Sequence, residues 1–150
     1  IVGNGSRKPF LTEKAKELEL ENVQFIPFQP REMVPEIYAT ADVSLVTLKR
    51  DIALDSVPSK IYTIMASARP VLAAVDQGSD AWRLVQKAEC GVCVPPEDPN
   101  ALKETIHYFY QHPDQRREMG ENGREYVIKH HTREVVGEMY HELLTSLGNE

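Results

Sequence analysis

Short apolar runs that alternate with helical segments constrain the fold of this chain most. They lie at residues 42–46, 71–75 and 92–94, and helical spacing of apolar residues follows each of them. Strands separated by helices predict right-handed β-α-β units and therefore a parallel sheet. Runs this short and apolar are typical of strands that are covered on both faces. We therefore expect an α/β, Rossmann-like fold, with a parallel sheet and helices on both of its faces.

The remaining segments fit the same scheme, and a length of 150 residues suits one domain. Ser79, Asp98 and Thr132 each precede a helical segment, and we predict that their side-chain oxygens cap the first turn of that helix. The other expected elements are strands at 1–3 and 23–26, helices at 9–20, 31–40, 58–68 and 80–88, and helical structure from 99 to about 147 with breaks near 112–113 and 131–132.

Residues 55–74 are the segment most suited to ligand chemistry. Asp55 opens a loop, Pro58 suits the first position of a helix, and Lys60 lies in the first turn of that helix. The free backbone N–H groups and the dipole at a helix start both favour an anion. The segment therefore predicts an anion site, although a surface lysine and a helix-capping Ser59 would explain the same residues without a ligand.

Composition excludes some classes of function. Hydrophobic residues make up 41% of the chain and charged residues 27%, as in an ordinary globular protein. The net charge of −6 argues against a nucleic-acid surface, which needs a basic stripe. No run approaches the roughly 20 apolar residues that a membrane-spanning helix needs.

Cys90 and Cys93 are spaced as in redox and zinc motifs. A zinc site needs two further ligands, and the chain has no second cysteine pair. A redox pair usually begins a helix, whereas these residues belong to a predicted strand. We therefore expect two reduced, packed thiols of a cytosolic protein.

Five landmarks in fixed order carry a resemblance to a known family. They are residues 1–5, 22–28, 38–45, 58–73 and 90–96, with a closing pair of helices. In this order they resemble the C-terminal, donor-binding half of the retaining glycosyltransferases of family four, also called group 1, which have the two-domain GT-B architecture. The Pro-Ser-Lys form of residues 58–60 is similar to the branch that makes colanic acid and other surface polysaccharides.

The resemblance implies a site for a nucleotide-sugar. The family's first glutamate, which contacts the donor sugar, falls on Asp55, and its second, which holds the ribose hydroxyls, falls on Thr63. Thr63 lacks the charge and the paired acceptor oxygens that a ribose diol would use. The implied diphosphate site is formed by Val57, Pro58, Ser59 and Lys60, and Phe28 is the implied base contact. A turn-closing aspartate remains the alternative for Asp55.

The implied function is transfer of a sugar from a UDP-sugar, or less favourably a GDP-sugar, to a lipid-linked or polysaccharide acceptor. The family implies no bound metal or other cofactor, and the histidines show no metal-ligand spacing. The implied location is cytoplasmic, with peripheral association at the inner membrane. Two alternatives stay open: a sugar-nucleotide 2-epimerase of the same architecture, and a degenerate nucleotide-sugar-binding or scaffolding module, which Thr63 favours.

The chain begins inside an expected strand and without a methionine. Compared with the family, residues 1–150 are expected to form one partial nucleotide-sugar-binding domain that lacks the first strand. We expect residues 113–150 to pack toward the acceptor domain, and we expect the chain by itself to be inactive. Ala68 stands where the family has glycine, and a left-handed backbone there would cost about 1 kcal/mol.

Overall fold

The computed structural model describes residues 1–52 and 54–147, which divide into two compact units, Ile1–Glu36 and the described residues from Ile37 onward. The first unit contains helix α1 (Lys8–Glu17) and one isolated parallel bridge between Val2 and Ile26. The expected strands at 1–3 and 23–26 are therefore reduced to a single bridge, because a pair of short strands without a third neighbour is marginal. The expected helix at 9–20 ends early, where Glu19 turns to a φ of 51°.

The expected helix at 31–40 is divided in the structure. A 3-10 turn, η1 (Arg31–Met33), precedes α2 (Val34–Ala39), which spans the boundary between the units. Pro35 explains the division, because a proline lacks the N–H that a continuous helix would need at that point and is tolerated only in a first turn.

The second unit contains a parallel sheet, as predicted. Its strands are β1 (Ser44–Thr47), β2 (Val71–Ala74) and β3 (Gly91–Val94), in the order β1-β2-β3. All three begin in register, since Ser44 pairs with Val71 and Val71 pairs with Gly91. Among the described residues, β1 pairs with β2 alone, and the expected missing strand stays a prediction.

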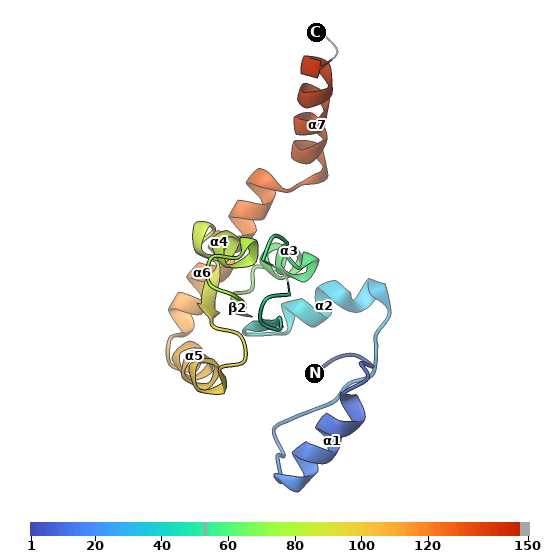
Figure 1. Cartoon of the computed structure of the whole chain (residues 1–150), viewed down its shortest axis with the longest axis vertical. Coiled ribbons are helices and arrows are strands. Elements are labelled where there is room, and N and C mark those ends of the chain that lie inside the picture. Colours follow the sequence, from blue (N-terminus) through green and yellow to red (C-terminus); the bar gives the residue numbers. More distant parts are fainter. Residues whose placement is uncertain (53, 148–150) are drawn as a thin grey trace. The chain divides into compact units, whose positions relative to one another are not determined.

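Helices cover both faces of this sheet (Figure 1). On one face lie α3 (Ser59–Ala66) and α4 (Asp80–Lys87), and on the other lies α5 (Pro99–Gln111). The long helix α6 (Pro113–His130) packs against α3, and α7 (Arg133–Leu147) follows it after a break. The breaks near 112–113 and 131–132 are where the sequence predicts them.

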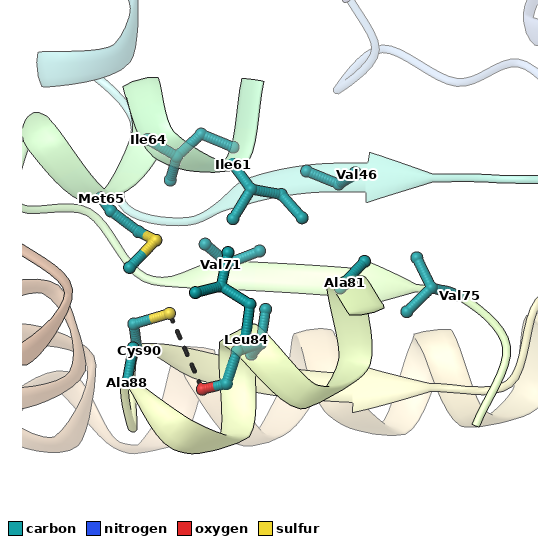
Figure 2. Packing of buried hydrophobic residues seen from close by; sticks show 12 residues of the cluster. Val46, Ile61, Ile64, Met65, Val71, Val75, Ala81, Leu84, Ala88 and Cys90 are labelled. Atoms are coloured by element: carbon teal, nitrogen blue, oxygen red, sulfur yellow. Dashed lines mark hydrogen bonds between the residues drawn. The ribbon is translucent and has the colours of Figure 1, made fainter. Parts of the chain in front are cut away.

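The main hydrophobic core lies between the sheet and the pair α3 and α4 (Figure 2). Ile61, Ile64 and Met65 of α3 are buried against Val46 of β1 and Val71 of β2. Each fully buried side chain of this size contributes roughly 1.5–3 kcal/mol relative to an exposed one. This burial fixes the axis of α3 against the sheet. A smaller cluster on the opposite face joins Leu72, Ala74, Val94 and Phe109.

The three predicted N-caps are confirmed. Ser79 Oγ accepts the N–H of Trp82 at 3.2 Å, and Thr132 Oγ1 accepts that of Val135 at 3.3 Å. Asp98 Oδ1 accepts two N–H groups in the first turn of α5, at 3.0 and 2.9 Å. The ends of these helices are thus set by local side-chain chemistry.

Two glycines bring α6 close to the core. A Cβ at Gly120 would lie 2.3 Å from the carbonyl oxygen of Ala68, and one at Gly123 would lie 2.9 Å from Cβ of Cys90. Ala68 itself has a φ of 53°, as expected for a position where the family has glycine. The left-handed turn after α3 therefore packs directly on the backbone of α6.

The two cysteines pack as small side chains. Both are free, Cys90 is buried, and its Sγ donates to the carbonyl oxygen of Val85 at 3.8 Å. Burial raises the pKa of each thiol from 9.0 to about 12, since a thiolate loses its hydration there. A thiol with such a pKa is a poor nucleophile.

We expect replacement of Gly120 by alanine to destabilise the second unit by about 1–3 kcal/mol, because the new methyl group must displace backbone of the Ala68 turn. The midpoint of urea unfolding measures this loss. Gly137→Ala is the matched control, since a Cβ there meets nothing within 4 Å, and it should be neutral or stabilising by up to about 1 kcal/mol. Equal midpoints for the two variants would contradict the close approach of α6.

The free energy of unfolding should fall as the pH rises above about 9. The folded-state pKa of the Cys90 thiol lies above its unfolded value, so its contribution is complete below pH 9 and is lost as the pH rises toward 12. Urea titrations between pH 7 and 10.5 measure the slope. Cys90→Ala should reduce this slope but not abolish it, because the pKa values of Cys93 and Tyr62 are raised as well. An unchanged slope in that variant would show that folding does not raise the pKa of the Cys90 thiol.

Candidate functional site

Three loops meet at the carboxyl edge of the parallel sheet. They follow β1, β2 and β3, at residues 48–58, 75–79 and 95–98. Ligands of open α/β sheets bind at this edge, because helix N-termini and mobile loops gather there. The candidate site is therefore sought among these loops and the helices that follow them.

The helices that begin at this edge differ in whether a side chain accepts hydrogen bonds from the backbone N–H groups of their first turn. A side chain caps α4 through Ser79 and α5 through Asp98. The N-cap residue of α3 is Pro58, and no side-chain hydrogen bond caps this helix. Within the described residues, no hydrogen bond uses the backbone N–H of Ser59 or Lys60. Among the described residues, the first turn of α3 thus has two exposed N–H donors without a partner, whereas α5 has none and α4 has one, on the buried Ala81.

The sequence-predicted residues of the diphosphate site lie together at this turn. Ser59 and Lys60 are exposed, whereas Val57 and Pro58 are half-buried. Pro58 is the N-cap, with φ −57° and ψ 124°, and the helix begins at Ser59. The expected helix start at Pro58 is thus one residue too early, because its extended ψ excludes it from the first turn. The alternative role of Ser59 as a capping residue is not observed.

The other predicted residues fall in different surroundings. Asp55 is exposed in the loop before α3, and Thr63 is half-buried one turn into the helix. Phe28 belongs to the first unit, where 74% of its surface is exposed. The predicted sugar, ribose and base contacts of these three residues stay predictions.

Contacts between the loops were not foreseen from the sequence. The backbone N–H of Asp51 donates to Asp76 Oδ2 at 2.9 Å, and that of Asp80 donates to the carbonyl oxygen of Leu54 at 2.9 Å. Arg50 Nη2 donates to the carbonyl oxygen of Pro96 at 3.2 Å. The loop after β1 is thereby tied to both of the other loops. The signal in the sequence for these contacts was Asp76, an aspartate that directly follows the predicted strand at 71–75.

The rear of α3 contacts the break between α6 and α7. The rings of Tyr62 and His131 lie 4.8 Å apart between centroids. Burial lowers the pKa of His131, and the nearby His130 and Lys87 lower it further. Burial, assisted by Tyr126 and Asp80, raises the pKa of Tyr62. Both groups are therefore neutral near pH 7.5, and they brace α3 by packing rather than by charge.

The described residues contain neither a cluster of metal ligands nor a membrane-spanning helix. No three His, Cys, Asp or Glu side chains gather there in a way that would hold a metal ion. No described helix combines the length and the apolar character of a membrane crossing.

Comparison with known proteins identifies the family. Residues 1–126 match the family model described as glycosyl transferases group 1. The chain is 30% identical over 106 residues to the probable glycosyltransferase WbjE of Pseudomonas aeruginosa, covering 71% of this chain and 26% of that protein. It is 32% identical over 103 residues to WcaI of Escherichia coli, a glycosyl transferase named for colanic acid biosynthesis, covering 68% of this chain and 25% of that protein.

The fold agrees with this assignment. HepE of Anabaena, solved in complex with UDP, superposes with a TM-score of 0.80 at 22% identity, covering 97% of this chain and 40% of HepE. The chain spans about a quarter of the length of the two curated relatives. From the match over residues 1–126 and the shared α/β fold, the chain belongs to the group 1 glycosyltransferases.

Proposed function

We propose that this chain is the donor-binding part of a retaining glycosyltransferase, and that the first turn of α3 holds the diphosphate of a UDP-sugar. The observation that carries the proposal is the uncapped start of α3, beside two helices whose starts are capped. Its N–H groups, its dipole, the Ser59 hydroxyl and the Lys60 ammonium together suit an anion of two charges or more.

The chemistry of transfer explains why such a turn would be needed. Negative charge develops on the nucleoside diphosphate as it leaves the sugar, and preorganised donors that face this charge lower the barrier. Loss of one such donor costs roughly 3–4 kcal/mol of barrier in enzymes that use them. In this scheme Asp55 contacts the donor sugar and Thr63 lies at the ribose.

The proposal for the acceptor is supported by the family and by the name of one relative. The name of WcaI, a glycosyl transferase of colanic acid biosynthesis, supports a polysaccharide acceptor. A lipid-linked acceptor, bound on the cytoplasmic side by another part of the polypeptide, is proposed from the family resemblance. The apolar side chains of α7 support the expectation that residues 113–150 cover such a part. Met139, Leu143 and Leu147 are 62%, 55% and 63% exposed.

Thr63 is the one observation that favours a second candidate, a module that binds a nucleotide-sugar without transferring it. A threonine hydroxyl offers one donor and less acceptor capacity than a carboxylate. Binding alone does not separate the two candidates, whereas release of UDP in the presence of acceptor does.

UDP should bind the full-length polypeptide that carries these residues, and Lys60→Met should weaken binding about tenfold, because one charge-assisted hydrogen bond to the diphosphate is lost. Isothermal titration calorimetry with UDP and with GDP measures the affinity and identifies the preferred base. Lys103→Met removes an exposed lysine from α5 and is the matched control with unchanged affinity. Equal affinities for the two variants, or a folded protein that binds neither nucleotide, would reject the site.

Thr63→Glu should raise the affinity for UDP about tenfold, because a carboxylate can accept both ribose hydroxyls. The same titration with 2′-deoxy-UDP is the control, since this ligand lacks one of the two hydroxyls and should show a smaller gain. A variant that stays folded but gains nothing for UDP would show that the ribose does not lie at Thr63.

A further inference from the structure

The loop before α3 is held at two points by the turn between β2 and α4. The backbone N–H of Asp51 donates to Asp76 Oδ2 at 2.9 Å, and the carbonyl oxygen of Leu54 accepts the N–H of Asp80 at 2.9 Å. We call these two hydrogen bonds the loop clamp. On the turn side, Asp76 lies two residues after β2 and Asp80 is the first residue of α4, whereas both partners on the loop side precede Asp55.

The Asp76 carboxylate has a rigid base. It follows Val75, which is fully buried and donates its backbone N–H to the carbonyl oxygen of Val94 at 3.1 Å. The carbonyl oxygen of Asp76 accepts the N–H of Ser79 at 3.1 Å, which closes the turn before α4. An acceptor fixed in this way can dictate the position of a more exposed donor.

The donor side of the clamp needs such support. Asp51 is exposed and has a φ of 58°, a left-handed conformation that is unfavourable for a non-glycine residue. A hydrogen bond to a charged acceptor is stronger than one to a neutral acceptor, and it offsets the cost of this conformation. Without the carboxylate oxygen, we expect the loop to leave it.

The loop clamp also affects which helix start can donate its N–H groups to a ligand. The N–H of Asp80 is the first in α4, and the clamp directs it at Leu54 rather than at a ligand. Leu54 precedes Asp55, so the same bond fixes where the chain enters the segment that leads to Ser59. The loop clamp thus occupies the first N–H group of α4 and fixes the position of the chain where it leads into α3.

We propose that Asp76 is a positioning residue for the donor site: its carboxylate holds the loop so that the first turn of α3 receives the diphosphate. The inference rests on the proposed function, since it assigns a role to Asp76 in the binding of UDP. Asp76 acts through the backbone of the loop and makes no contact with the ligand in this scheme.

The test compares Asp76→Ala with Asp76→Asn in the full-length polypeptide. Both substitutions remove the charge, so a difference between them reports the acceptor oxygen, which asparagine keeps and alanine lacks. We expect Asp76→Ala to bind UDP five- to tenfold more weakly than Asp76→Asn in calorimetry. Backbone hydrogen exchange in peptides covering residues 48–60 should be faster in the alanine variant and close to wild type in the asparagine variant.

Asp98→Ala is the control for a purely structural effect. It removes a carboxylate that accepts two backbone N–H groups at the same edge of the sheet, but these belong to α5. We expect it to lower the unfolding midpoint without changing the affinity for UDP. Equal UDP affinities for Asp76→Ala and Asp76→Asn would overturn the inference, as would an equal loss of affinity in Asp98→Ala.

Failure of the proposed function gives a different result. If wild-type protein binds neither UDP nor GDP, the proposed donor site is wrong and the role of Asp76 in it falls as well. Hydrogen exchange in residues 48–60 then still shows whether the Asp76 carboxylate holds the loop. If UDP binds and exchange is the same in all variants, the clamp alone is wrong.

Discussion

Burial of one face of α3 against the sheet is the interaction on which the rest of the second unit depends. Ile61, Ile64 and Met65 are buried where α3 packs on β1, β2 and α6, and this packing fixes the axis of α3 (Figure 2). The helix start is thereby held at the carboxyl edge of the strands, with Ser59 and Lys60 exposed. A ligand site at this turn consequently depends on core packing, although none of the core residues would touch the ligand.

The same helix is supported from behind by α6. Close approach of α6 requires Gly120 and Gly123, because a side chain at either position would meet backbone or core atoms. The ring of His131, just after α6, lies against Tyr62 of α3. The long C-terminal helix therefore serves as a brace for the helix that carries the proposed phosphate contacts, and it does so mainly through packing.

At the carboxyl edge of the sheet, side chains cap the first turns of α4 and α5 but not that of α3. Ser79 and Asp98 use the first-turn donors of α4 and α5, and the loop clamp uses a further donor of α4. Among the described residues, exposed first-turn N–H groups without a partner remain at α3, whereas the one that remains at α4 belongs to the buried Ala81. A parallel sheet has several helix starts at one edge, so local capping chemistry selects among them where an anion is favoured.

The sequence alone determined the α/β class, the strands of the second unit within two residues, the breaks around α6, and the N-caps at Ser79, Asp98 and Thr132. These features depend on apolar periodicity and on contacts within four residues, which a single sequence displays. It also carried the family resemblance, which the match over residues 1–126 confirmed. It was wrong about the strands at 1–3 and 23–26 and about the unbroken helix at 31–40.

Only the tertiary structure decided that Pro58 stands outside α3, that α3 has no side-chain cap, and that Asp76 reaches the N–H of Asp51. The last contact joins residues 25 positions apart. Periodicity and propensity describe the chain locally, whereas a hydrogen bond between two loops depends on how the strands beneath them are paired. The sequence therefore located the start of α3, and the pairing of the strands determined which neighbouring groups fix the loop that leads to it.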